Sequence, residues 1–391
     1  MKKVILSTLT AFMLVSGVEA STKLYTDANG QVFSKPGEGR TELKSPTPWY
    51  SHADKLKFGV QTFLGYKYKD FEDDQTSAGK PYRDDTSQFE IRRAYFQVKA
   101  YLLEDPKSYY RVTFDMHQDT KQDGSGTDGD MVFRAKYAYL YLNEILPSTG
   151  VEIGLAHRPW HDYEEHNAWF FRNISKVLIE QGNGANLSNS ADFGFMFKTK
   201  TKYFDADYGV FNGEGYHAVQ VKKGMSFEWR MTGHLLGTKG KDKEKEVTYW
   251  DVSFFGQYNQ EHKEVDAQTQ DLVFGGLHTV YNQPNFLASA QYVKSLDTAD
   301  NGISVQAGKG YSVYGEYRFG NGYDYRILAR YDSWTPEQTD KEQRTVIGGM
   351  AWDQNKNVEW VANVELTDNE KGSPREDRNG MAYMVTAEIK F

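Results

Sequence analysis

Residues 309–333 decide the fold, and they read Lys-Gly-Tyr-Ser-Val-Tyr-Gly-Glu-Tyr-Arg-Phe-Gly-Asn-Gly-Tyr-Asp-Tyr-Arg-Ile-Leu-Ala-Arg-Tyr-Asp-Ser. In the first half, Tyr311, Val313, Tyr317 and Phe319 alternate with polar or small residues. The run Gly-Asn-Gly at 320–322 then separates them from a second alternating segment. Because side chains of a β-strand point alternately to its two faces, the stretch predicts two strands joined by a short turn.

The same period of two runs from Lys57 to Phe391. We predict sixteen strands, near 57–67, 87–102, 108–118, 131–143, 150–157, 191–199, 204–212, 225–236, 247–258, 271–281, 285–295, 309–319, 323–333, 344–354, 357–367 and 380–391. Long polar connections follow the odd-numbered strands, such as 158–190 and 259–270, and mostly short ones follow the even-numbered strands. This rhythm predicts an all-β fold, a transmembrane antiparallel β-barrel of about 16 strands over 57–391.

Composition excludes several other classes of protein. The 391 residues include no Cys, which removes disulfide frameworks, zinc–thiolate sites and Cys nucleophiles. The only long uncharged apolar stretch runs from Val4 to Val18, so a bundle of membrane-spanning helices is excluded. A formal net charge of -8 disfavours a polyphosphate ligand, and we therefore expect no nucleic-acid partner.

The N-terminal segments indicate export. Lys2 and Lys3 precede the apolar run, and Val18-Glu19-Ala20 provides small residues for cleavage, so we predict a signal peptide over 1–20. The alternative for this stretch is an N-terminal anchor. Residues 21–56 show no sustained alternation and predict a periplasmic segment with a small hairpin at Asn29-Gly30. Asp27 and Asn29 also resemble the start of a calcium loop, but further acidic ligands are missing.

The strand over 380–391 carries a second signal, which also indicates an exported protein. Tyr383, Val385, Ala387, Ile389 and Phe391 alternate with polar residues, and the sequence stops on the aromatic residue. This resembles the C-terminal assembly signal of bacterial outer-membrane proteins. Aromatic residues near strand ends are expected to form girdles on the lipid-facing side: Tyr137, Tyr139, Tyr141, Trp250, Trp352 and Trp360.

A barrel of sixteen strands is too wide for side chains to fill, so an aqueous lumen is expected. The positions of opposite parity to the apolar face carry basic residues, which we expect to line the pore: Arg93, Lys99, Arg111, Arg134, Lys136, Arg158, Arg318, Arg326 and Arg330. Basic charge at a constriction favours anions. The alternative is a solvated lining without selectivity, because inward charges cost little in water.

The longest connection, 158–190, is the candidate constriction loop. It places His161, Asp162, Glu164 and Glu165 where they are expected to face the basic wall and set a field across the pore. A metal site built from His157, His161 and His166 with Asp162 and Glu165 is the alternative, but its spacing requires a helix. A polar loop is the default, and the prediction includes no metal and no cofactor.

Parts of the chain resemble the phosphate-selective porins of the O and P type. The resemblance is carried by residues 92–100 (Arg-Arg-Ala-Tyr-Phe-Gln-Val-Lys-Ala), 110–115, 138–140, 152–154, Arg158-Pro159 and 192–194. It implies a homotrimer of sixteen-stranded barrels in the outer-membrane lipid, with basic residues guiding anions such as phosphate. Arg93, Lys99, Arg111, Arg134, Lys136 and Arg158 match the family's basic positions. Trp160-His161 departs from the family pattern, as do the acids of the loop.

The function implied is a passive porin for small hydrophilic solutes, with anions preferred. A general or cation-preferring porin, dominated by Asp162, Glu164 and Glu165, is the first alternative. An outer-membrane enzyme or adhesin is a second, from another class. Ser188, His157 and Asp192 could form a catalytic triad, but no nucleophile elbow surrounds that Ser.

Overall fold

The computed structural model describes residues 25–27, 31–42, 53–72, 76–77, 79, 82–118, 129–216, 224–237, 247–265, 268–296 and 307–391. The chain divides into two compact units, Met1–Asp54 and Lys55–Phe391. The expected signal peptide, 1–20, lies outside the described residues. Among the described residues, no helix is long and apolar enough to cross a membrane.

The first unit contains a small antiparallel sheet. Its strands β1 (Tyr25–Thr26), β2 (Val32–Phe33) and β3 (Thr41–Glu42) lie in the order β2-β1-β3. β1 pairs with β2, with Tyr25 opposite Phe33, which is the pairing that a hairpin over this stretch requires. The turn itself, at Asn29-Gly30, lies outside the described residues.

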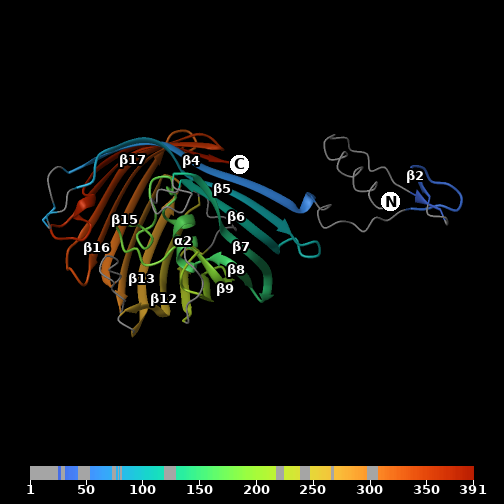
Figure 1. The fold of residues 1–391 in the computed structure, drawn as a ribbon, viewed down its shortest axis with the longest axis horizontal. Coiled ribbons are helices and arrows are strands. Elements are labelled where there is room, and N and C mark those ends of the chain that lie inside the picture. The colour runs from blue at the N-terminus through green and yellow to red at the C-terminus, as the bar shows by residue number, and fades with distance from the viewer. Residues whose placement is uncertain are drawn as a thin grey trace. The chain divides into compact units, whose positions relative to one another are not determined.

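A 3-10 turn, η2 (Ala53–Lys55), spans the boundary between the units. The second unit is a closed barrel of sixteen antiparallel strands (Figure 1). The strands are β4 (Leu56–Phe71), β5 (Thr86–Tyr101), β6 (Tyr109–Gln118), β7 (Met131–Leu146), β8 (Thr149–His157), β9 (Ala191–Lys200), β10 (Phe204–Phe211), β11 (Ser226–His234), β12 (Tyr249–Val265), β13 (Gln268–Gln283), β14 (Phe286–Leu296), β15 (Gly308–Phe319), β16 (Tyr325–Pro336), β17 (Gln343–Asn355), β18 (Val358–Asn369) and β19 (Gly380–Lys390). β19 pairs with β4 and closes the ring. The predicted fold class is therefore confirmed.

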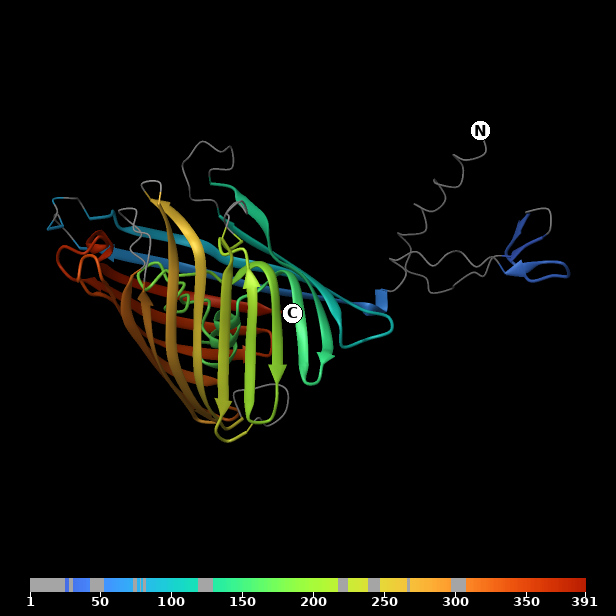
Figure 2. The ribbon, with the colours of Figure 1, turned by 90° about the horizontal axis from the view of Figure 1, so that it is seen from below.

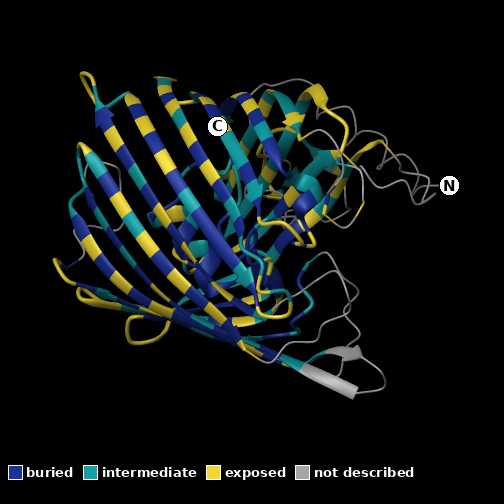
Figure 3. Ribbon diagram, turned by 90° about the vertical axis from the view of Figure 1, so that its left-hand side faces the viewer, coloured by how far each residue is buried: buried dark blue, intermediate teal, exposed yellow. Residues whose placement is uncertain are grey.

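Alternation along each strand separates the two faces of the barrel wall. On β15, Tyr311, Val313 and Tyr317 are 42–54% exposed, whereas Ser312 and Glu316 are buried. Figure 3 shows the same stripes of buried and exposed residues along many strands. Trp250, Trp352 and Trp360 are also exposed, as expected for the outer face. An apolar exterior around a polar interior is the pattern that a barrel in lipid requires.

One predicted connection is part of two strands. The sequence predicted a loop over 259–270, but β12 continues to Val265 and β13 begins at Gln268. The register shifts between Asn259 and Lys263, after which pairing resumes. The sequence of this stretch is mostly polar and shows no alternation, yet the described residues still pair through their backbones.

The connection 158–190 folds into the barrel. It begins with helix α2 (Pro159–Asn167), whose Pro159 supplies the fixed φ favoured in the first turn. Figures 1 and 2 both show the segment that carries α2 inside the ring of strands. A short 3-10 helix, η3 (Glu376–Arg378), lies in the connection between β18 and β19.

Candidate functional site: the lumen and its basic wall

The loop 158–190 packs against one side of the barrel interior. Trp160 stacks on Phe255 of β12 with ring centroids 3.7 Å apart, and Tyr163 donates a hydrogen bond to Asp251 at 2.6 Å. The loop and the wall share an apolar core that includes Trp169, Phe171, Ile174, Val177, Leu178, Ile179, Leu272, Val280, Leu287, Tyr314, Leu328, Ile347, Val361 and Met384. The loop therefore occupies the side of the lumen formed by β12 to β19.

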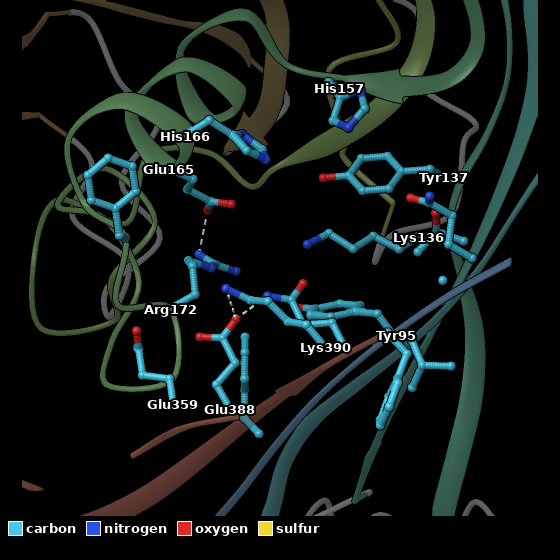
Figure 4. A pocket seen from close by; sticks show the side chains of 18 of the residues that line it. Tyr95, Lys136, Tyr137, His157, Glu165, His166, Arg172, Glu359, Glu388 and Lys390 are labelled. Atoms are coloured by element: carbon cyan, nitrogen blue, oxygen red, sulfur yellow. Dashed lines mark hydrogen bonds and ion pairs between the residues drawn. The ribbon is translucent and has the colours of Figure 1, made fainter. Parts of the chain in front are cut away.

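A cavity of about 530 Å³ remains between the loop and the opposite wall. The wall contributes Tyr95, Arg111, Lys136 and Tyr137, and the loop contributes Glu165 and Arg172. In Figure 4, the Lys136 ammonium and the Tyr137 hydroxyl point into this space, toward the loop.

Two β-bulges interrupt the strands of this wall. In the pairing of β4 with β5, Phe63 lies opposite Arg93 and Leu64 opposite Ile91, so Arg92 is an extra residue. In the pairing of β6 with β7, Thr113 lies opposite Tyr137 and Phe114 opposite Ala135, so Lys136 is extra. A bulge interrupts the alternation, and the residues on both sides of it can then face the same way.

The bulge at Lys136 overturns part of the aromatic-girdle prediction. Tyr137 and Tyr139 are only 7% and 1% exposed. Both contact the Arg111 guanidinium and the ring of His157, inside the barrel. Tyr141 lies on the same inner face, against the ring of Tyr109 at 5.2 Å. Strict alternation from Met131 predicts that these three residues face outward. The bulge at Lys136 reverses their orientation, and the sequence does not reveal it.

Most of the expected pore-lining cations are paired with carboxylates. Arg93 and Arg134 both donate to the fully buried Asp115, at 2.8 and 3.0 Å. Arg158, 2% exposed, donates to Asp192 at 2.7 Å. On the far wall, the remaining pairs are Arg318 with Glu316, Arg326 with Asp353 and Glu359, and Arg330 with Asp332. Each of these arginines contacts a carboxylate, although Arg93 and Arg134 share one.

A second group of cations is held by tyrosine rings. The Lys99 Nζ lies 4.7 Å from the ring centroid of Tyr109, and the Lys136 Nζ lies 4.7 Å from that of Tyr95. Arg111 lies over Tyr137 at 4.9 Å and donates to the Thr113 hydroxyl at 3.0 Å. Lys57, which the sequence analysis did not single out, lies 5.1 Å from the ring of Tyr101.

We call Lys57, Lys99, Arg111 and Lys136 the tyrosine-held cations. Among the residues that the structure describes, none of the four forms a salt bridge with a carboxylate. The register places Lys57 opposite Lys99, and Lys99 opposite Arg111. Like charges directly across a strand pair are destabilising, so this row works against the stability of the sheet.

Lys57 and Arg92 are among the inward cations that were not predicted, and the reasons differ. Lys57 precedes the outward-facing Phe58 on the first predicted strand, so the parity rule points it inward and could have found it. Arg92 donates to the Ile174 carbonyl of the loop at 3.0 Å, which places it inside as well. Simple alternation puts Arg92 outside, because its neighbour Arg93 faces in.

The acids of the loop are not free to face the basic wall. Asp162 accepts from Lys198 at 2.9 Å, and Glu165 pairs with Arg172 at 2.6 Å. Glu164 is buried and accepts from the Gln291 amide at 2.6 Å. Burial raises the pKa of Glu164 from an ordinary 4.5 to about 8, so its carboxyl is protonated at neutral pH.

Two histidines of this region approach the Asp162 carboxylate, His157 at 3.8 Å and His166 at 3.4 Å. His157 Nδ1 lies 3.0 Å from Glu152, whereas His166 donates to the Asp162 backbone carbonyl at 2.7 Å. His161 is 1% exposed, and burial lowers its pKa to about 3. Within the described ranges, no group of three or more His, Asp and Glu side chains is arranged to hold a metal ion.

No protein-family model matches the sequence, and no curated protein sequence matches it. Solved structures do share the fold. OmpF of Salmonella typhi, in complex with daunomycin, is 13% identical with a TM-score of 0.61, and the match covers 86% of this chain and 97% of that chain. The anion-selective porin of Comamonas acidovorans is 13% identical, with a TM-score of 0.58 and coverages of 86% and 98%. The trimer form of OmpT from Vibrio cholerae is 13% identical, with a TM-score of 0.55 and coverages of 86% and 100%.

Proposed function

We propose that this chain is an outer-membrane porin, a water-filled channel for the diffusion of small hydrophilic solutes that prefers anions. The fold supports a channel, since solved porins share the closed sixteen-stranded barrel. The observation that carries the preference for anions is the group of tyrosine-held cations on the wall opposite the loop.

The tyrosine partners matter because they leave the cationic charge in place. A carboxylate beside an arginine cancels most of the charge that a distant ion feels, as for Arg330 with Asp332. A tyrosine ring attracts a cation through its quadrupole and carries no net charge. Since the Debye length is about 8 Å in physiological salt, only uncancelled charges close to the path select a passing ion.

The cation-preferring alternative has less support. It depended on Asp162, Glu164 and Glu165, but the first and third are paired with Lys198 and Arg172, and the second is protonated at neutral pH. An enzyme has no support from Ser188, His157 and Asp192. His157 is bonded to Glu152, and Asp192 accepts from Arg158 instead of orienting a histidine.

The finer parts of the proposal come from the sequence. A signal peptide over 1–20 would deliver the chain to the outer membrane, where residues 21–56 would lie in the periplasm before the barrel at 57–391. The protein would be a homotrimer, as the resemblance to phosphate-selective porins implies. The same resemblance makes phosphate the first inorganic anion to test.

The test is the reversal potential across a planar bilayer that separates two concentrations of KCl. The wild-type protein is expected to show a reversal potential of the sign for chloride preference. Replacing two tyrosine-held cations, in the variant Lys99→Gln/Lys136→Gln, should move that potential toward zero, because two of the four tyrosine-held charges are lost.

Lys341→Gln provides the matched control. Lys341 lies outside the strands, where it pairs with Glu370 at 3.4 Å, so its loss removes a charge that is already screened and paired. Its reversal potential should equal that of the wild type. A wild type that prefers potassium contradicts the proposal, as does a double variant with an unchanged potential.

A further inference from the structure

Tyrosine rings form a continuous path along the basic wall. Tyr101 and Tyr109 lie directly opposite each other on β5 and β6, with ring centroids 5.7 Å apart. Tyr109 lies 6.2 Å from Tyr139, which lies 6.5 Å from Tyr137. Lys136 then connects Tyr137 to Tyr95, with its Nζ 5.2 and 4.7 Å from the two ring centroids. We call the five tyrosines of this path the tyrosine track.

Each ring of the track has a cation beside it. Arg111 lies within 5.9 Å of both Tyr137 and Tyr139, while Lys99 lies beside Tyr109 and Lys57 beside Tyr101. Along the wall from β4 to β7, each tyrosine ring of the track is thus accompanied by a charged side chain. A filter for inorganic anions needs the cations alone, and the interior of a wide barrel is ordinarily polar.

The cavity beside the track has the character of a ligand site. Its volume of about 530 Å³ falls in the range that is usual for small-molecule pockets, and both aromatic and charged side chains line it. Phe63 and Phe170 line it together with Tyr95 and Tyr137. Phe63 also packs edge-on against Tyr95, with centroids 6.1 Å apart, so the ring of Tyr95 is held in place.

Lys136 is one of several charged groups at this cavity, which Arg111, Arg172 and Glu165 also line. The residue is 5% exposed, its ammonium points into the cavity, and it lies over the rings of Tyr95 and Tyr137, with Tyr216 also near. A buried ammonium is costly unless it is paired, and an anionic group in the cavity would provide the missing partner. A planar ring attached to that group could stack on a tyrosine at the same time.

We infer that the tyrosine track and its cations form a binding path for aromatic carboxylates, small anions in which a planar ring carries the charged group. This rests on the proposed anion-preferring channel and names its substrate class. The carboxylate contacts Lys136 or Arg111, and the ring packs against Tyr95 or Tyr137.

The test measures block of the chloride current by benzoate in the purified, membrane-inserted protein. Cyclohexanecarboxylate is the comparison, because it has the same charge and nearly the same size but no planar ring. Acetate and inorganic phosphate test charge without any ring. Benzoate is expected to give half-block at about a tenfold lower concentration than cyclohexanecarboxylate, a difference of about 1.4 kcal/mol.

Variants of Tyr95 show whether its ring is responsible. Tyr95→Leu should bring the two half-block concentrations together, whereas Tyr95→Phe, which keeps the ring, should retain most of the difference. Tyr311→Leu removes a tyrosine from the outer face of β15 and should leave the difference unchanged. Conductance and the oligomeric band on a gel, compared with the wild type, establish that each variant is folded.

Equal block by benzoate and cyclohexanecarboxylate in the wild type overturns the inference, as does tighter block by phosphate than by benzoate. A Tyr95→Leu variant that retains the full difference overturns it too. The reversal potential in KCl alone separates this failure from that of the proposed function. An anion-preferring channel without discrimination between the two acids loses only the inference, whereas a cation-preferring channel loses both.

Discussion

Single extra residues decide which side chains face the lumen. The bulges at Arg92 and Lys136 each shift the alternation by one position, so Arg92 and Arg93 both reach the interior, and Tyr137 follows Lys136 inward. Alternation correctly gave the inward orientation of Arg93, which contacts Asp115. It could not place Tyr137, because a bulge depends on pairing with the neighbouring strand and leaves no local pattern in the sequence.

Asp115 limits how much positive charge the wall presents. Its carboxylate is fully buried and accepts from both Arg93 and Arg134. The change Asp115→Asn removes the negative charge and keeps the shape, so the reversal potential should move further toward anion preference. Stability should fall by about 1.5–3 kcal/mol, because hydrogen bonds to a charged group are lost.

Asp368→Asn is the control for that prediction. Asp368 pairs with Arg344 at 3.0 Å, but the two side chains are 45% and 35% exposed. Exposed pairs contribute about 0–1 kcal/mol, so neither the potential nor the unfolding midpoint in urea should change much. A loss of anion preference in Asp115→Asn would mean that Arg93 and Arg134 need the carboxylate in order to face the path.

Glu164 should make the docking of the loop dependent on pH. The pKa of Glu164 is raised by burial from 4.5 to about 8, even though Arg330 opposes the shift. The folded state therefore binds this proton more tightly than the unfolded state, and the contribution of Glu164 to stability falls as the pH rises from about 4.5 through about 8. We expect fluctuations of the open-channel current to increase between pH 5 and pH 8.

The variant Glu164→Gln mimics the protonated carboxyl at every pH and should lack that increase. Gln291, which donates to Glu164, remains unchanged in this variant. Fluctuations that grow equally in both proteins would assign the effect to another group.

At the scale of elements, the loop 158–190 and the wall from β12 to β19 form one packing unit. Its length and position between strands predicted that it folds inward. The apolar residues that receive it, such as Val280 and Ile347, were not predicted, because their strands are apolar at positions of both parities. Where both faces are apolar, alternation no longer shows which one meets lipid.

Ile174 anchors the loop in this unit and is 1% exposed. The change Ile174→Asp would bury a carboxylate without a partner, so the loop should leave the wall. Because the loop occupies part of the lumen, single-channel conductance should rise and the current should become noisier. Measurement of single channels in a planar bilayer checks both.

Ile174→Val is the matched control, since it removes one methylene and typically costs about 0.5–1.5 kcal/mol. Its conductance should remain that of the wild type. A normal, quiet channel in Ile174→Asp would show that other contacts, such as the stacking of Trp160 on Phe255, are sufficient to hold the loop.

At the scale of the whole molecule, the most exposed aromatic side chains gather on one sector of the barrel. Among the described residues, the four most exposed large apolar side chains are Phe89 at 87%, Phe391 at 76%, Phe133 at 66% and Phe58 at 64%. They lie on β4, β5 and β7, and beside β4, where Phe391 bonds to the Val60 backbone. Protruding aromatic residues are enriched at protein interfaces, so this sector is our candidate for the contacts of a homotrimer.

The variant Phe89→Ser/Phe133→Ser is expected to shift the protein from a trimer toward a monomer in mild detergent, as measured by light scattering after size exclusion. Leu277→Ser changes a residue of β13 that is 58% exposed on the outer face, away from this sector, and should leave the trimer intact. A monomeric wild type would contradict the prediction of a trimer directly.

The strand plan was the most predictable property of the molecule. All sixteen strands were expected close to their observed bounds, because lipid on one side and water on the other impose a period of two on each strand. The exception is 259–270, where the sequence lacks this alternation although the described residues pair as strands. The candidate site was predicted less well. Some of its cations pair with carboxylates and others lie over tyrosine rings, and these partners are tertiary contacts that the sequence does not show.

The pairing of β4 with β19 also constrains how the molecule can be made. The amide of Gln61 bonds to the Glu388 carboxylate across this seam, between residues 327 positions apart, whereas every other neighbouring pair consists of consecutive strands. Hairpins between consecutive strands form locally, but the seam requires a long segment of chain to come together, which is slow. Until then β4 and β19 are open edges that can pair with other chains. A chain interrupted before β19 therefore encloses no pore and leaves an edge free for aggregation.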